Sequence, residues 1–174
     1  MRSALAVLSE EELAASDHAL LSRFLALPEA AQARNILLFF GVGTEVRTAR
    51  LFGALQAAGK IIALPRCLPR RRMEARVVTL EDSLIPGAYG IPEPGESCPV
   101  LPRDGIDLIL VPALCYDRLR FRLGQGGGYY DRYLAGYPGC TVGLCRDILL
   151  QERIPHTGTD LPVRILLTET ASIR

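Results

Sequence analysis

A glycine-rich segment, flanked by arginine and followed by aspartate, has the residue types and spacing needed to bind a polyphosphate. It reads Arg-Leu-Gly-Gln-Gly-Gly-Gly-Tyr-Tyr-Asp-Arg-Tyr-Leu over residues 122–134. Glycine lacks a Cβ, so its backbone N–H can approach a ligand closely, and a helix that begins behind the glycines presents unpaired N–H donors. Arg118, Arg120 and Arg122 add positive charge, and Asp131 is placed to hold a metal ion. The segment therefore predicts an anion cradle.

Local composition alone leaves other interpretations open. Glycine clusters also form flexible loops, and tyrosines at helical spacing also pack in cores. No Gly-Lys-Ser/Thr follows the glycines, so the segment is not a Walker A loop. Tyr129 stands where the third glycine of a dinucleotide fingerprint would be, which disfavours a dinucleotide-dependent oxidoreductase.

The composition is that of an ordinary folded protein. The chain has 174 residues, 49% of them hydrophobic and 22% charged, and we expect a single domain over residues 1–174. A net charge of +1 gives no drive toward nucleic acid or an anionic membrane. No cleavable leader and no membrane-spanning apolar run is visible. The odd number of cysteines, five, without a C-x-x-C pair favours free thiols in a reducing cytoplasm.

Helical and strand patterns alternate along the chain. A helix is expected over residues 3–27, where Ser9 and Glu12 form a capping box before an apolar face. Further helices are expected at 50–58 and from 129 onward, a helical turn or linker at 30–34, and strands at 36–40, 60–64, 73–80, 107–111, 139–145 and 165–167. This alternation predicts an α/β fold, a three-layer, doubly wound, mostly parallel sheet with helices on both faces.

Ligands of such sheets bind beyond the carboxyl ends of the strands. Four unusual segments follow predicted strands, namely 41–45, 65–66, 112–128 and 154–160. Arg66 directly follows a predicted strand end and is a candidate ligand-binding residue, whereas Arg70–Arg72 are expected to form a solvated turn. Prolines on both sides of Glu93 fix the direction of that carboxylate. We therefore expect the four segments to meet at one edge of the sheet.

Motifs in these segments resemble the 5-formyltetrahydrofolate cyclo-ligase family, also called methenyltetrahydrofolate synthetases. The resemblance runs over most of the chain, and its most specific part is the glycine-tyrosine segment. The matching motifs are Glu45, Gly59-Lys60, Leu64-Pro-Arg66, Met73, Gly90-Ile-Pro-Glu-Pro94, Val111-Pro-Ala-Leu-Cys-Tyr-Asp117, Arg122-Leu-Gly-Gln-Gly-Gly-Gly-Tyr-Tyr-Asp131 and Thr159-Asp160.

The resemblance implies an ATP- and Mg²⁺-dependent ligase that converts 5-formyltetrahydrofolate to 5,10-methenyltetrahydrofolate, ADP and phosphate. ATP would phosphorylate the formyl oxygen, and N10 of the folate would then close the ring. The substrate is expected with or without a polyglutamate tail, and the enzyme is expected to be a monomer or weak homodimer. Phosphoryl transfer of this kind needs positioning and charge neutralisation rather than a protein nucleophile.

The resemblance also implies roles for individual residues. Catalytic roles fall on Arg122 and Tyr129, and the magnesium ligands would be Asp131 and Asp160. The ATP-binding residues would be Arg122, Leu123, Gly124, Gln125, Gly126, Gly127, Gly128, Tyr129 and Tyr130. The folate-binding residues would be Glu45, Arg66, Gln125, Gly126, Gly127, Gly128 and Tyr129.

The chain departs from the family pattern at three places. An N-terminal Lys-x-x-Leu-Arg motif has no match, and Arg2 is the basic residue nearest to it. Ala113 replaces a usual glycine, and Arg164 stands where a second acidic residue is common. Either Arg2 and the loop arginines substitute for the lysine, or ATP binds more weakly, or translation starts upstream. The alternative function is a non-catalytic folate- or nucleotide-binding relative that lacks the phosphate-binding lysine.

Overall fold

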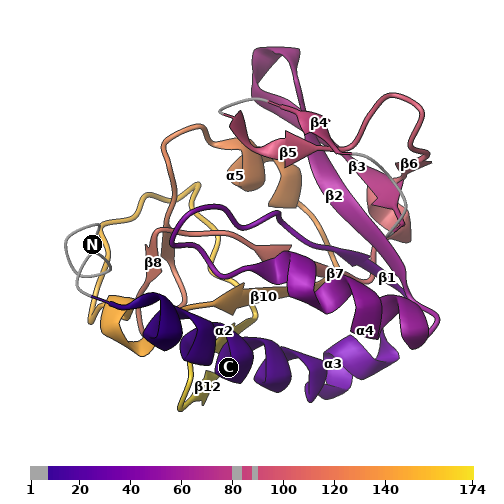
Figure 1. Ribbon diagram of the computed structural model, residues 1–174. Helices are drawn as coiled ribbons and strands as arrows, with labels where there is room; N and C mark the ends of the chain where they lie inside the picture. Colours follow the sequence, from indigo (N-terminus) through magenta and orange to yellow (C-terminus); the bar gives the residue numbers. More distant parts are fainter. Residues whose placement is uncertain (1–7, 80–83, 88–89) are drawn as a thin grey trace.

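An eight-stranded sheet forms the centre of the molecule (Figure 1). The computed structural model describes residues 8–79, 84–87 and 90–174. The strands of the sheet are β1 (Asn35–Leu37), β2 (Ile61–Leu68), β3 (Arg72–Val78), β6 (Val100–Leu101), β7 (Leu108–Val111), β10 (Cys140–Leu144), β11 (Ile165–Leu167) and β12 (Ser172–Ile173). Their order is β12-β11-β10-β7-β1-β2-β3-β6. Strands β11, β10, β7, β1 and β2 run parallel, and β12, β3 and β6 pair antiparallel at the two sides.

The central strands are buried on both faces, as their apolar runs predict. All four residues of β7 have no exposed surface. Leu108 and Leu110 belong to the hydrophobic cluster on one face of the sheet, whereas Ile109 and Val111 belong to the cluster on the other. Because side chains alternate along a strand, one short strand joins the two cores.

The first face is covered by α2 (Glu10–Leu25), α3 (Pro28–Gln32), the 3-10 turn η1 (Thr48–Leu51) and α4 (Phe52–Ala57). The predicted capping box at the start of α2 is confirmed, since Glu12 N donates to Ser9 Oγ at 3.1 Å and Ser9 N donates to Glu12 Oε2 at 2.7 Å. The stop signal after α4 is confirmed as well, because Gly59 has a φ of 73°. Residues 3–7 of the predicted first helix lie outside the described residues, as does Arg2.

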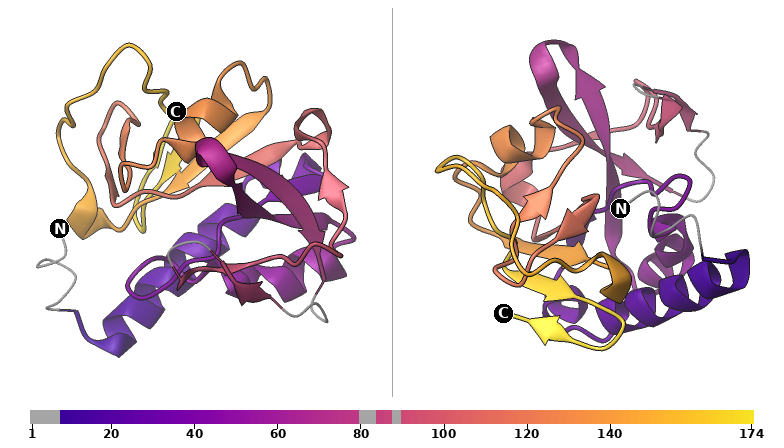
Figure 2. Two further views of the ribbon diagram at one scale, coloured as in Figure 1. Left: turned by 90° about the horizontal axis from the view of Figure 1, so that it is seen from above. Right: turned by 90° about the vertical axis from the view of Figure 1, so that its left-hand side faces the viewer.

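The second face carries the helix α5 (Tyr129–Leu134) and a hairpin of β8 (Cys115–Tyr116) and β9 (Arg122–Leu123). Figures 1 and 2 show α5, in orange, on the opposite side of the sheet from the indigo and purple helices. The remaining elements are η2 (Pro69–Arg71), β4 (Ile85–Pro86), β5 (Pro92–Glu93), η4 (Arg103–Gly105) and η5 (Asp147–Leu149). The predicted α/β class, with a mostly parallel sheet and helices on both faces, is confirmed.

Two local predictions were wrong. Strand β2 does not end at Pro65 but continues to Leu68, paired with β3. Strand β1 pairs with β2 only at Ile61–Ala63, so one side of β2 is open from Pro65 onward, and a proline is tolerated where its missing N–H faces that side. The segment 112–128, expected as one long loop, contains the β8–β9 hairpin.

Within the described ranges, no helix is both long and apolar enough to cross a membrane.

Candidate functional site

Two neighbouring pockets open beyond the carboxyl ends of β1, β7 and β10, the edge at which parallel sheets bind ligands. The apolar pocket, of about 660 Å³, is lined by Phe39, Val42, Gly43, Thr44, Glu45, Val46, Ile91, Ala113, Leu114, Cys115, Gln125, Leu144, Cys145, Arg146 and Leu149. The glycine-loop pocket, of about 550 Å³, is lined by Phe39, Phe40, Glu45, Pro65, Cys67, Ile91, Pro112, Ala113, Leu114, residues 122–131, Pro155 and Asp160. All four segments expected at this edge contribute to the second pocket.

Backbone conformation and the space available to a side chain explain three of the four glycines at residues 124–128, namely Gly126, Gly127 and Gly128. Gly126 has a φ of 81° and Gly128 a φ of 64°, a region that side chains with a Cβ rarely adopt. A Cβ on Gly127 would lie 2.8 Å from the Tyr129 ring. Gly128 caps α5 without a side-chain bond, so the first N–H groups of this short helix have no side-chain partner at the cap. The chain therefore bends tightly around the pocket, as expected for a cradle.

Arg122 lies between the two predicted metal ligands. Its side chain is 6% exposed, pairs with the Asp131 carboxylate and donates to Leu161 O at 3.0 Å. Asp160 accepts from Thr157 N at 2.6 Å and from Thr157 Oγ1 at 2.9 Å, and these bonds, helped by the charge of Arg122, lower the pKa of Asp160. Asp131 and Asp160 therefore both interact with one fixed cation on the wall of the glycine-loop pocket.

The donor set is compatible with Mg²⁺ but not with a fully protein-bound ion. Within residues 8–79, 84–87 and 90–174, no group of three or more His, Cys, Asp or Glu side chains is arranged to hold a metal. Mg²⁺ commonly binds through one or two carboxylates and keeps waters and phosphate oxygens as its other ligands. Asp131 and Asp160 meet that requirement as a pair on one pocket wall.

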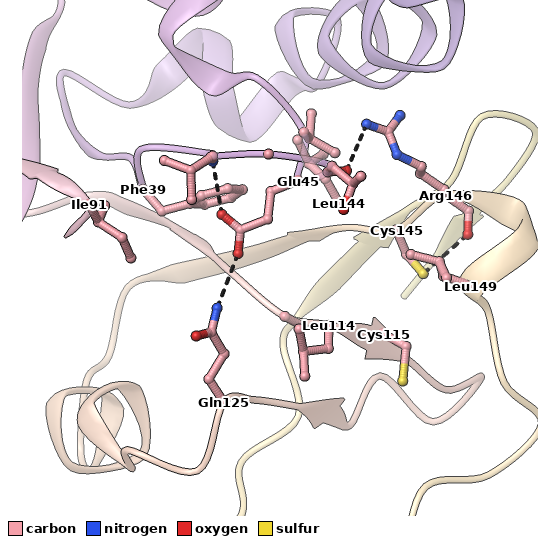
Figure 3. Close-up of a pocket in the computed structure, with 15 residues that line it drawn as sticks. Phe39, Glu45, Ile91, Leu114, Cys115, Gln125, Leu144, Cys145, Arg146 and Leu149 are labelled. Carbon is pink, nitrogen blue, oxygen red and sulfur yellow. Dashed lines mark hydrogen bonds between the residues drawn. The ribbon is translucent and has the colours of Figure 1, made fainter. Parts of the chain in front are cut away.

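Glu45 and Gln125 form the polar part of the wall that the two pockets share. Gln125 Nε2 donates to Glu45 Oε1 at 3.4 Å, and Val42 N donates to Glu45 Oε2 at 3.1 Å (Figure 3). Burial raises the pKa of Glu45, while the bonds from Val42 and Gln125 act in the opposite direction. Glu45 is therefore a partly desolvated carboxyl at the junction between two cavities.

Of the arginines that were singled out in the sequence and that the structure describes, only Arg122 lines the glycine-loop pocket. Arg66 points instead to the 94–96 segment, where it donates to Pro94 O at 2.9 Å and pairs with Glu96 at 3.0 Å. Arg118 pairs with Glu152, and Arg120 donates to Val163 O at 3.0 Å. The expectation that Arg118 and Arg120 add charge to the cradle was wrong, because the β8–β9 hairpin directs both side chains elsewhere.

The tyrosines of the segment have different surroundings. Tyr129 and Tyr130 line the glycine-loop pocket. The buried Tyr130 hydroxyl has no hydrogen-bond partner among the described residues, and burial raises its pKa, so it is a neutral phenol with bonding capacity to spare. Tyr129 bonds the Cys67 thiol, whose pKa burial and the neighbouring Glu93 raise to about 12. Cys67 is therefore a neutral wall residue.

Sequence reasoning missed the side of the apolar pocket that the end of β10 and the residues after it form. Leu144, Cys145 and Leu149 line it from segments without a motif. Arg146, which is 3% exposed on its side chain, follows the end of β10 and was not singled out. Its position directly after a buried parallel strand was the available signal.

Comparisons with known proteins agree on one family. The model of the 5-formyltetrahydrofolate cyclo-ligase family matches residues 1–169. A probable 5-formyltetrahydrofolate cyclo-ligase of Schizosaccharomyces pombe is 29% identical over 191 residues, covering 100% of this chain and 94% of the relative. The 5-formyltetrahydrofolate cyclo-ligase of Escherichia coli K12 is 29% identical over 153 residues, covering 84% of each chain. The NMR structure of Aquifex aeolicus 5,10-methenyltetrahydrofolate synthetase matches with a TM-score of 0.86 at 31% identity, covering 99% of this chain and 89% of the other.

Proposed function

The chain belongs to the 5-formyltetrahydrofolate cyclo-ligase family and is a ligase, and we propose that it uses ATP and Mg²⁺ to form 5,10-methenyltetrahydrofolate from 5-formyltetrahydrofolate, releasing ADP and phosphate. The observation that carries the proposal is the shared wall. Glu45 and Gln125 face both the apolar and the glycine-loop pocket, so two ligands held in the two pockets would meet there.

The two pockets suit different ligands. The apolar pocket offers Phe39, Leu114 and Leu144 for a flat aromatic ring, with the Glu45 carboxyl as its hydrogen-bonding group. The glycine-loop pocket offers backbone N–H groups and the Arg122 guanidinium for phosphate oxygens. Asp131 and Asp160 would hold Mg²⁺ beside them. Bound MgATP would supply the phosphoryl group that turns the formyl oxygen into a leaving group.

The protein's own contribution is orientation and charge. Arg122 is held by Leu161 O and by Asp131, so its charge is already in place and needs no rearrangement during reaction. Glu45 is tied to Val42 N and Gln125, which fixes the direction of a substrate-binding carboxyl. With a ligand bound, the apolar side chains of the apolar pocket would exclude water, which would strengthen the electrostatic contacts that Arg122 and Glu45 make with the ligands. Holding two reactants in line lowers the barrier by replacing a bimolecular encounter.

The test is turnover by the purified chain. With MgATP and 5-formyltetrahydrofolate together we expect methenyltetrahydrofolate, seen by its near-ultraviolet absorbance, and one ADP for each product. Leaving out ATP, Mg²⁺ or the folate in turn should abolish the signal. Calorimetry that detects folate binding without ATP binding, together with absent turnover, would overturn the proposal in favour of a non-catalytic binding protein.

A further inference from the structure

An aspartate occupies the buried stripe of α2. Leu13, Leu20 and Phe24 form the apolar face predicted for this helix, and Asp17 lies on the same face at helical spacing. Its side chain has no exposed surface. A carboxylate in such a place is strongly unfavourable unless it is paired and fully hydrogen-bonded. The buried face of α2 therefore contains a charged group that packing does not require.

Two arginines from other parts of the chain satisfy that carboxylate. Arg146 Nη2 donates to Asp17 Oδ1 at 2.7 Å, and Arg47 Nε donates to Asp17 Oδ2 at 2.6 Å. Arg146 is 3% exposed and also donates to Ser16 Oγ at 2.5 Å and to Leu13 O at 3.4 Å. The three charged groups join α2, the segment after β1 and the end of β10.

The partners of Asp17 lie on both sides of Glu45. Arg47 follows Glu45 by two residues, and Arg146 Nη2 also donates to Thr44 O, the residue before it, at 3.3 Å. Figure 3 shows the Arg146 guanidinium reaching this loop from the far wall of the apolar pocket. The Glu45 side chain in turn closes the loop through Val42 N. The direction of Glu45 is thus tied to a residue of α2 that touches neither pocket.

We propose that Asp17 and Arg146 are positioning residues of the substrate site, which hold the Thr44–Arg47 segment and thereby direct Glu45 toward the wall shared by the two pockets. The inference deepens the proposed function and rests on it only where folate binding is the readout. Packing alone does not account for the arrangement, because an apolar residue at position 17 would bury the same helix face without the cost of desolvating an ion.

The first experiment compares Asp17→Asn with Leu20→Ala, a change that weakens the same helix one turn away without removing a charge. We expect Asp17→Asn to speed hydrogen exchange of the 42–47 amides. It should also weaken 5-formyltetrahydrofolate binding by about tenfold, the lower end of the about 10- to 100-fold cost of removing a residue that orients a binding group. MgATP affinity should stay unchanged. If exchange and folate affinity change no more than in Leu20→Ala, the inference is overturned.

The double variant Asp17→Leu/Arg146→Met removes both charges together, so neither is left buried alone. We expect its thermal stability to exceed that of Asp17→Asn while loop exchange stays fast and folate affinity stays low. If the double variant recovers wild-type exchange and affinity, the Asp17–Arg47–Arg146 cluster only stabilises the fold, and the inference is overturned. A wild-type chain that does not bind 5-formyltetrahydrofolate refutes the proposed function instead, and the exchange measurement then decides the positioning role by itself.

Discussion

Asp131→Asn separates a metal-binding role from a structural one. The change keeps the size and shape of the side chain, and the amide oxygen can still accept a bond from Arg122. The ion pair it weakens joins a 6% exposed guanidinium to a 34% exposed carboxylate. Because the carboxylate is partly open to solvent but the guanidinium is buried, the loss of unfolding free energy should lie between the about 1 kcal/mol of a surface pair and the about 3–5 kcal/mol of a broken buried pair.

The change should also raise the Mg²⁺ requirement of the reaction. Mg²⁺ would lose one of the two carboxylates on the pocket wall, and changing only an outer partner of a metal ligand already costs about 10- to 100-fold in affinity. We therefore expect the Mg²⁺ concentration for half-maximal turnover to rise at least about tenfold. The assay is the initial rate of methenyltetrahydrofolate formation against Mg²⁺ at fixed ATP and folate, with thermal melting in parallel.

Asp104→Asn is the matched control. Asp104 also pairs with an arginine, Arg103, at 3.9 Å, but its side chain is 93% exposed and lines neither pocket. This variant should keep the wild-type Mg²⁺ dependence. If Asp131→Asn keeps it too, Asp131 is not a metal ligand, and the assignment of the acidic pair to Mg²⁺ is refuted.

Three further outcomes are expected. Ser9→Ala removes the cap of α2 and should cost about 1 kcal/mol in urea unfolding, and an unchanged midpoint would contradict the capping role. Gly41→Ala should lower the melting temperature and the folate affinity, since its Cβ would lie 1.9 Å from Val46 O, while the control Gly53→Ala has open space and should stabilise its helix by about 0.5–1 kcal/mol. Burial raises the pKa of Glu45 in the folded protein. Above this folded-state pKa the ionised carboxylate lowers the free energy of unfolding. Below the pKa of Glu in the unfolded chain, about 4.3, the carboxyl is protonated in both states and the loss disappears. Glu45→Gln should therefore melt higher than wild type at about pH 7 but equally at about pH 3, and a constant difference across this range would refute the assignment.

The features that the sequence predicts correctly depend on neighbours along the chain. The Ser9–Glu12 box and Gly59 act within one helical turn, so their residue types identify the ends of α2 and α4 without any tertiary information. The apolar run of β7 identifies a strand buried on both faces for the same reason. The glycine segment belongs to this class, because positive φ values at Gly126 and Gly128 are local requirements.

Pro65 and Asp17 depend instead on strands and side chains distant in the sequence. In the sequence, Pro65 predicts the end of a strand. Strand β2 nevertheless continues past Pro65, because β1 pairs with β2 only up to Ala63 and the edge of β2 on that side is then unpaired. An aspartate on an apolar helix face gives no hint of its partners, since Arg47 and Arg146 lie 30 and 129 residues away. The β10 side of the apolar pocket escaped prediction because residues 144–149 carry no motif and meet the Glu45 segment only in the folded chain.

The arginines show why residue type at a strand end is a weak guide to a ligand site. Arg66 and Arg122 both belong to segments that reach the glycine-loop pocket. Arg66 binds Pro94 O and Glu96, however, whereas the Arg122 side chain lines the pocket. Arg122 is engaged as well, by Leu161 O and Asp131, so the two guanidiniums differ in position and not in the number of bound donors. Fixed positive charge on the wall of the glycine-loop pocket thus comes, among the described side chains, from Arg122 alone. If the proposed function holds, phosphate binding would therefore depend on Arg122, on backbone N–H groups and on the metal ion, and not on the other arginines of the loop.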